Sequence, residues 1–504
     1  MSMSARNSGG IAGGLRRLGA AAALAALLSS CAVGPDFDRP PAPAVSHYAA
    51  GADPAATAPA AGTAQRFAPG AAIAADWWRL FNSEKLGALV DEAIAANPGL
   101  EAAQQSLRQS QDNLRAGYGI FFPWLGADFG ASREKSLPLA MGSSAPGTIF
   151  NLFTLSGTIS YPLDIFGGER RAVEGLAAQV EVQRATEQAT YLALSSNLVD
   201  TVIARAAYRA EIEATEQLIA LQRQQVELAL VQARAGTVPY SNVLILQSQL
   251  AAYEATIPQL QQKLTQSDDL LATLAGRTPA EWTPPEMSLA DLTLPGELPV
   301  SLPSDLVRQR PDILAAEASA HAASAGIGVA TAAMLPSVTL SGTYGTANTA
   351  IGNLFSSSGR FWSFGADVTA PLFEGGKLWF QRKAAIDAYR QAMALYRQTV
   401  LGAFAQVADT LRALDHDATA LAAEEKAVQT AEDALHLVQA NYAAGLATYF
   451  DVLTADTQYY QARINDLQIV AMRYQDTVAL FAALGGGWWN AERRDGAAAA
   501  STVD

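Results

Sequence analysis

The most regular pattern in the chain is a long run of apolar residues between residues 377 and 484, spaced alternately four and three apart. A 3.5-residue period is typical of helices that supercoil around one another. Because no proline interrupts this run, we predict a helical hairpin over residues 377–484 that turns at residues 442–448. A second copy spans residues 169–275 and turns at residues 235–239. In the first limb of the 377–484 hairpin the apolar positions are Val400, Phe404, Val407, Leu411, Leu414, Ala418 and Leu421.

A shorter helical pattern precedes each hairpin and indicates that the chain is duplicated. One helix is predicted from Pro98 to just before Pro123, and the same apolar spacing returns from Pro311 to Pro336. An internal repeat of this length predicts two structurally equivalent halves.

Between helix and hairpin, each half changes to a two-residue period. This predicts four strands, at about residues 124–133, 152–162, 337–346 and 361–371, each with one apolar face and one face rich in Ser, Thr and Gly. Strands of about ten residues with this alternation are typical of transmembrane β-strands. The alternative is a half-buried sheet of a soluble domain, but the chain offers no further segment to cover the apolar faces. The polar faces would then line water.

Four strands are too few to close a barrel, since about eight is the smallest number that encloses filled space. We therefore expect the chain to associate. A homotrimer would supply twelve strands around a wide, water-filled lumen and wrap its helical limbs into a cylinder, whereas a dimer would leave almost no lumen. The predicted fold class is a membrane α+β protein: a trimeric 12-stranded barrel continuous with a long α-helical barrel.

The N-terminus has the pattern of an export signal. Arg16 and Arg17 precede a short apolar run from Leu18 to Leu28, too short for a permanent membrane helix. Residues 28–31, Leu-Ser-Ser-Cys, resemble a bacterial lipobox, which implies an N-acyl diglyceride on Cys31 as the new N-terminus. The alternative is a simple signal peptide with an incidental cysteine. After residue 28 no apolar run reaches about 18 residues, so a membrane crossing would need a closed barrel.

These patterns divide the chain into six parts. The first three are a signal peptide (1–30), an extended lipidated tether rich in Pro, Ala and Gly (31–75) and the first repeat (76–278). A Pro-rich connection (279–303), the second repeat (304–486) and a flexible tail (487–504) follow.

The net charge and the absence of recognisable catalytic motifs argue against several classes of function. The formal net charge of -14 argues against nucleic acid as a partner. The four histidines lack metal-ligand spacing, and neither a phosphate-binding loop nor a nucleophile elbow occurs, so we expect no metal, no catalysis and no cofactor besides the acyl groups.

With these features the chain resembles the TolC/OprM/NodT family of outer-membrane efflux proteins. The resemblance implies an outer-membrane trimeric duct that reaches across the periplasm to a periplasmic adaptor and an inner-membrane pump, commonly of the RND type, and that exports small molecules such as drugs. It rests on residues 31–36 (CAVGPD), 310–313 (RPDI), 371–376 (PLFEGG), 451–453 (DVL) and 483–488 (ALGGGW).

The candidate gate lies just past the second hairpin turn. Threefold symmetry would bring three copies of Asp451 to the axis, where like charges would attract cations. The family resemblance assigns Asp451 and Tyr442 to a periplasmic gate, and Asn242 is the first-repeat equivalent of Asp451. The alternative is that Thr448 and Asp451 form a helix capping box, and the two roles are compatible.

The two hairpin turns are candidate adaptor contacts. Gly236 and Gly445 most simply provide the left-handed conformation that ends a helix. By the family resemblance, the exposed turns also dock the adaptor. The residues concerned are Gly236, Thr237, Val238, Gly445, Leu446 and Ala447.

Other functions remain open. Within the family, the duct could serve metal-cation efflux or type I protein secretion. A different class would be a structural coiled-coil lipoprotein that ties the outer membrane to the cell wall. The amphipathic strands argue against such a spacer, because it needs no face suited to lipid.

Overall fold

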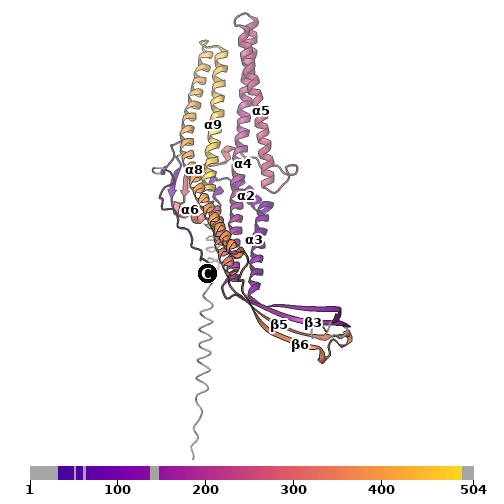
Figure 1. Cartoon of the computed structure of the whole chain (residues 1–504). Coiled ribbons are helices and arrows are strands. Elements are labelled where there is room, and N and C mark those ends of the chain that lie inside the picture. Colours follow the sequence, from indigo (N-terminus) through magenta and orange to yellow (C-terminus); the bar gives the residue numbers. More distant parts are fainter. Residues whose placement is uncertain (1–31, 50, 52, 61–63, 137–146, 491–504) are drawn as a thin grey trace, which may run out of the picture. The chain divides into compact units, whose positions relative to one another are not determined.

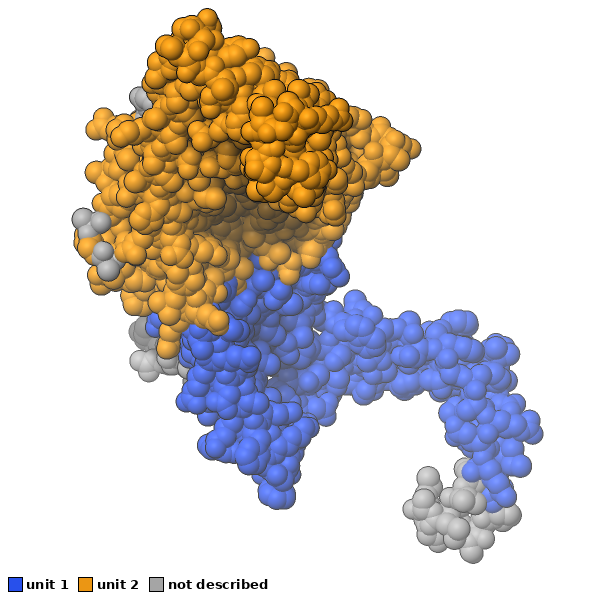
Figure 2. Space-filling model, turned by 90° about the horizontal axis from the view of Figure 1, so that it is seen from above, with its two compact units in different colours: residues 1–39, 108–182, 316–396 blue, residues 40–107, 183–315, 397–504 orange. Residues whose placement is uncertain are grey.

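The computed structural model describes residues 32–49, 51, 53–60, 64–136 and 147–490. The predicted signal peptide and Cys31 lie outside the described residues. The chain divides into two compact units, coloured separately in Figure 2. Unit 1 comprises the described parts of residues 1–39, 108–182 and 316–396, and unit 2 those of residues 40–107, 183–315 and 397–504.

The helices reflect the duplication. The first half contains α2 (Glu84–Ala96), α3 (Pro98–Gly117), α4 (Gly168–Arg234) and α5 (Tyr240–Leu274). The second half contains α6 (Pro303–Gln309), α7 (Pro311–Ala332), α8 (Lys377–Ala443) and α9 (Tyr449–Ala483). The long helices α4 and α8 have 67 residues each and their partners α5 and α9 have 35 each, so the two hairpins are matched in length.

The 3.5-residue pattern in α8 marks positions that are buried within unit 2. Apolar side chains at this spacing lie on one face of a helix and pack against its neighbours. Within the described part of α8, the buried members of the predicted set are Val400, Val407, Leu411, Leu414, Ala418 and Leu421.

Unit 1 contains an antiparallel sheet in the order β2-β3-β5-β6 (Figure 1). Its strands are β2 (Trp124–Ser136), β3 (Thr148–Leu163), β5 (Ser337–Asn348) and β6 (Arg360–Thr369). β2 and β3 extend a few residues beyond the predicted bounds, and the two halves of the chain meet where β3 pairs with β5. Among the described strands, β2 and β6 are the edges of this sheet.

The register places most of the apolar side chains of the four strands on one face, although Trp124 and Phe361 lie on the other. Leu125 pairs with Ile159, which pairs with Gly342, which in turn pairs with Phe364. Most of the large apolar side chains on this face are exposed in the single chain, including Leu125, Phe129, Trp362, Phe364 and Val368. Ser and Thr side chains such as Ser156, Thr158 and Ser363 occupy the opposite face.

Unit 2 contains a small sheet that the sequence patterns did not predict. Strand β1 (Arg66–Pro69), within the predicted tether, pairs in parallel with β4 (Glu297–Val300), within the predicted connection. Gln65 next to β1 is fully buried, and its amide Nε2 donates to the Pro295 carbonyl at 3.1 Å and to Thr477 Oγ1 at 3.3 Å. The end of the tether is therefore docked rather than free, because long-range hydrogen bonds hold it.

Aromatic side chains form the centre of the unit 2 core. Trp77 is fully buried and stacks on Phe481 with 5.1 Å between ring centroids. The predicted tail also begins with docked residues: Trp488 Nε1 donates to the Gln309 carbonyl at 2.9 Å. Residues 491–504 lie outside the described residues.

One helix among the described residues, α7, is long and apolar enough to cross a membrane, by length and composition only. Its polar side chains nevertheless form contacts within unit 1. Glu317 pairs with Arg39 at 2.7 Å, and His321 Nε2 lies 2.9 Å from Glu174 Oε1. These contacts favour the interpretation of α7 as a packed helix.

Candidate functional site

The candidate site is the end of unit 2 where both hairpins turn, defined here as the tip, residues 229–246 and 441–457. In Figure 1 the turns that join α4 to α5 and α8 to α9 lie at the same end of the unit. Both turns end a helix in the same way. Gly236 and Gly445 have φ of 76° and 74°, in the left-handed region that favours glycine.

Two backbone hydrogen bonds close each turn. In the second hairpin, the Leu446 N–H donates to the Asn441 carbonyl at 2.8 Å and the Gly445 N–H to the Tyr442 carbonyl at 3.0 Å. The first hairpin repeats this pattern from Thr237 and Gly236. This is the Schellman arrangement, which satisfies the last carbonyls of a helix. The turn geometry predicted for both glycines is therefore present.

Asp451 occupies a complete capping box at the start of α9. Its Oδ2 accepts hydrogen bonds from the Thr448 N–H at 2.8 Å and from Thr448 Oγ1 at 2.7 Å. In return, the Asp451 N–H donates to Thr448 Oγ1 at 3.2 Å. The side-chain and backbone hydrogen bonds from Thr448 lower the pKa of Asp451 below its ordinary value, so the exposed carboxylate stays ionised. The hydrogen bonds of a helix cap are therefore present at Asp451, whereas its gate role stays a prediction.

Tyr442 lies on the preceding limb, close to the aromatic side chain that opens α9. Its ring centroid is 5.8 Å from that of Tyr449. The Tyr449 hydroxyl donates to Gln224 Oε1 at 2.7 Å and so links α9 to α4. A second link joins Gln225 Nε2 and Thr457 Oγ1 at 3.0 Å. Side-chain hydrogen bonds thus hold the two hairpins together near the tip.

Asn242 differs from its repeat equivalent Asp451 because Pro239 stands at the helix cap and has no side chain that accepts a hydrogen bond. Asn242 instead lines a groove of about 370 Å³ between the two hairpin ends. The structure therefore brings the predicted residues Asn242 and Val238 close to Thr448, the capping partner of Asp451. The groove is lined by Ala229, Gln232, Val238, Asn242, Ile245, Leu246, Thr448 and Phe450.

The tip exposes several large apolar side chains. Such a group on one surface indicates a protein contact. The exposed members are Val231, Tyr240, Leu244, Ile245, Tyr442, Leu446 and Tyr449, of which Leu446 is 80% exposed. The sequence patterns did not identify Gln224, Gln225 and Phe450 as contact residues. A Gln or Phe inside a periodic helix carries no sequence signal that distinguishes an interhelical contact from exposure to solvent.

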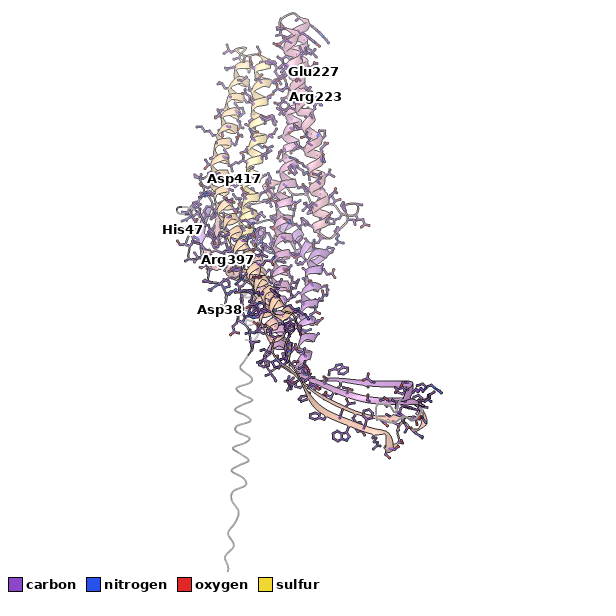
Figure 3. All side chains as sticks on the ribbon, viewed as in Figure 1. Asp38, His47, Arg223, Glu227, Arg397 and Asp417 are labelled. Atoms are coloured by element: carbon purple, nitrogen blue, oxygen red, sulfur yellow. The ribbon has the colours of Figure 1, made fainter. Side chains whose placement is uncertain are left out.

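A second group of titratable residues lies farther along the helices of unit 2, where Figure 3 labels Asp417 on α8. Burial raises the pKa of Asp417 to about 7, and hydrogen bonding with Asp476 and its charge act in the same direction. Arg473, only 2% exposed, opposes this shift and donates through Nε to Gln65 Oε1 at 3.0 Å. This group connects α8 and α9 to the docked segment before β1.

No group of three or more His, Cys, Asp or Glu side chains within the described residues could hold a metal ion. The predicted acylation site, Cys31, lies outside the described residues.

A duplicated strand-and-hairpin pattern, with a sheet in unit 1 that is largely apolar on one face and long helical hairpins, is typical of outer-membrane channel proteins. The chain belongs to the outer membrane efflux protein family, whose model matches residues 89–277 and 302–486, one stretch in each half. The resemblance stated from the sequence motifs is thereby confirmed, as is the outer-membrane location.

Individual relatives support this assignment. The pyoverdine export outer membrane protein OpmQ of Pseudomonas aeruginosa is 31% identical over 424 residues, which are 82% of this chain and 87% of OpmQ. The cation efflux system protein CusC of Escherichia coli is 26% identical over 471 residues, which are 92% of this chain and 97% of CusC. The solved outer-membrane channel OprN has 27% identity and a TM-score of 0.79, covering 91% of this chain and all of that chain.

Proposed function

We propose that the protein is the passive exit duct of a tripartite efflux system. Three copies form a closed 12-stranded barrel in the outer membrane and a helical barrel in the periplasm. A periplasmic adaptor contacts the tip, and an inner-membrane pump of the RND type drives transport. The duct itself performs no catalysis.

The observation that carries this proposal is the sheet of unit 1. One face exposes large apolar side chains while the other is rich in Ser and Thr, and among the described strands β2 and β6 have a neighbour on one side only. Lipid tolerates strands only when every backbone group is bonded, which requires closure of the sheet into a barrel. Neighbouring copies pairing β2 with β6 would achieve this closure.

Small molecules are the proposed cargo. The names of the relatives above refer to pyoverdine in one case and cations in the other, so membership of the family leaves the cargo class open. Because the wall of a duct contacts everything that passes, we propose that the pump selects the cargo. An acyl diglyceride on Cys31 would anchor the mature chain in the outer membrane.

The test uses full-length protein from outer membranes. We expect a trimer on gels that dissociates on heating, and ion conductance when the protein is inserted into planar bilayers. A structural spacer lipoprotein would fractionate with the outer membrane but would not conduct. Absence of conductance from a lipid-embedded trimer would therefore refute the duct.

The gate proposal is tested in the same assay. Asp451→Ala should raise single-channel conductance without loss of the trimer, because it removes three carboxylates proposed to lie at the axis. Asp433→Ala, an exposed carboxylate on α8 outside the tip, is the matched control and should leave conductance unchanged. Equal conductance of Asp451→Ala and wild type would exclude a gate role and leave Asp451 as a helix cap.

The adaptor proposal is tested by crosslinking in intact cells. A cysteine in place of Thr237 or Leu446, both exposed at the turns, should capture the periplasmic adaptor. A cysteine in place of Glu254, exposed on α5 outside the tip, should not. Equal capture at all three positions, or none at the turns, would count against docking at the tip.

A further inference from the structure

The residues that follow Cys31 are bound to unit 1 as an ordered segment, residues 32–39, here called the strap. The Val33 N–H donates to the Phe166 carbonyl at 2.9 Å, in the connection between β3 and α4. On both sides of this hydrogen bond, the strap backbone lies very close to the backbone of other parts of unit 1. A Cβ on Gly167 would lie 2.6 Å from the Ala32 Cα, and one on Gly34 would lie 2.5 Å from the Gly328 Cα. Only glycine permits such contacts, so the strap sits directly on α7 and on the β3–α4 connection.

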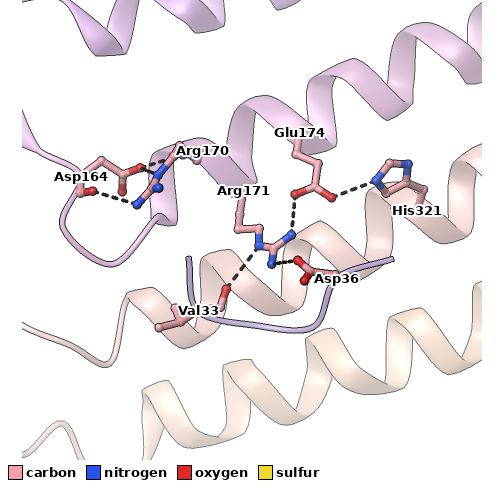
Figure 4. Close-up of polar contacts among 7 residues, drawn as sticks. All are labelled: Val33, Asp36, Asp164, Arg170, Arg171, Glu174 and His321. Carbon is pink, nitrogen blue, oxygen red and sulfur yellow. Dashed lines mark hydrogen bonds and ion pairs between the residues drawn. The ribbon is translucent and has the colours of Figure 1, made fainter. Parts of the chain in front are cut away.

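A buried arginine on the first turn of α4 holds the strap (Figure 4). The Arg171 side chain is 7% exposed, and its Nη2 lies 2.6 Å from Asp36 Oδ1. Its Nε donates to the Val33 carbonyl at 3.3 Å, and its Nη1 lies 2.7 Å from Glu174 Oε2. One guanidinium thus binds the strap at two residues and its own helix at a third. A planar guanidinium with several donors is suited to such a junction.

Three further contacts extend this attachment to α7. Glu174 Oε1 lies 2.9 Å from His321 Nε2, and the Phe37 ring stacks on the His321 ring with 4.6 Å between centroids. Arg39 pairs with Glu317 at 2.7 Å. The strap is therefore attached at several points between Val33 and Arg39.

The connection that the strap touches also fixes the end of β3. Asp164, immediately after this strand, accepts hydrogen bonds from the backbone N–H groups of Glu169 and Arg170 at 3.1 and 3.0 Å. Its carboxylate also pairs with the Arg170 side chain at 3.1 Å. The strap, the first turn of α4 and the end of a sheet strand are consequently one hydrogen-bonded assembly.

We propose that the strap is a docking element for the lipid anchor, which holds the acyl chains of Cys31 beside the strand ends of the unit 1 sheet, with Arg171 as the positioning residue. This inference rests on the acylation of Cys31 proposed above. If the strap were a flexible segment of this length, the root-mean-square distance between its ends would be about 16 Å, and the position of Cys31 would vary accordingly. Docking removes that freedom, so acyl chains and strand ends enter the same region of the membrane and strand insertion becomes effectively intramolecular.

The test is a double-mutant cycle in the full-length protein. Arg171→Gln is combined with Cys31→Ser, the latter behind a signal sequence that is cleaved without acylation. The measured quantity is the amount of heat-modifiable trimer in outer membranes. With acylated Cys31, Arg171→Gln should lower this amount about fivefold, which corresponds to about 1 kcal/mol. Without acylation, Arg171→Gln should cause little further loss, because its effect acts through the anchor.

Two strap variants exclude simple misfolding of the body. Asp36→Asn changes a side chain that is 91% exposed, and Phe37→Ala removes the stack on His321; both should behave like Arg171→Gln. Arg115→Gln, an exposed arginine of unit 1 paired with Asp112 at 3.0 Å, is the control and should have no effect.

The outcomes separate this inference from the proposed duct. Mass spectrometry of the N-terminal peptide reports the acylation of Cys31, and an unmodified cysteine would refute both the anchor and its docking. If the strap variants reduce trimer equally with and without acylation, or have no effect, the docking role is overturned while the duct stands. Failure of acylated wild type to form any conducting trimer would instead overturn the duct.

Discussion

Replacing Asp417 by Asn is expected to stabilise the protein at neutral pH and to remove a pH dependence. The Asp417 side chain is buried, and its Oδ2 has no hydrogen-bond partner within the described part of the chain. Burial, together with hydrogen bonding to Asp476 and the charge of that residue, raises the pKa of Asp417 from 3.8 to about 7. Asn has nearly the same shape and cannot ionise.

The sign and size of the effect follow from this pKa. Between about pH 4 and pH 7 the folded protein keeps a proton on Asp417 that the unfolded chain releases. The contribution of Asp417 to stability is therefore fully present below about pH 4 and falls by up to about 1.4 kcal/mol per pH unit until about pH 7. The accumulated loss is on the order of a few kcal/mol and belongs to the Asp417–Asp476 pair, and Asp417→Asn should reduce it.

The assay is thermal unfolding of the detergent-solubilised protein followed by far-UV circular dichroism, from about pH 4.5 to about pH 8. The midpoint of Asp417→Asn should exceed that of wild type by an amount that grows with pH. Asp409→Asn, an exposed carboxylate on the same helix, should give a constant difference near zero. Equal midpoints for wild type and Asp417→Asn at neutral pH would refute the assignment of a proton to this buried pair.

Three further changes test the packing. Gly445→Ala would impose about 1–2 kcal/mol of left-handed strain and should speed amide exchange at the tip. Gly402→Ala, inside α8 where the added Cβ would meet no other part of the described chain within 4 Å, should not speed exchange. Trp77→Ala removes a fully buried ring and should cost about 3–5 kcal/mol, seen as a lower thermal midpoint. Gln65→Ala removes a partner of Arg473 and should cost about 1–3 kcal/mol, with protease cleavage near β1 increasing; an uncut segment would contradict its docking by this side chain.

The helices and strands were accessible from the sequence because their signals are local. The 3.5-residue spacing from Val400 to Leu421 follows one helix face, and those side chains are buried almost without exception. The alternation in residues 361–369 likewise placed Trp362 and Phe364 on the same face of β6. The Thr448–Asp451 capping box spans only four residues, so it too was predictable.

Contacts between distant segments were decided by the tertiary structure. Gln65, next to the β1–β4 pair, donates a hydrogen bond to Thr477, and Arg171 donates one to Asp36 of the strap. The composition of residues 31–75, with few large apolar side chains, predicts an extended tether. Composition carries no information on hydrogen bonds to residues that are hundreds of positions away in the chain. Periodicity specifies which face of an element is apolar, whereas the partner of a buried polar group is set only when folding brings the segments together.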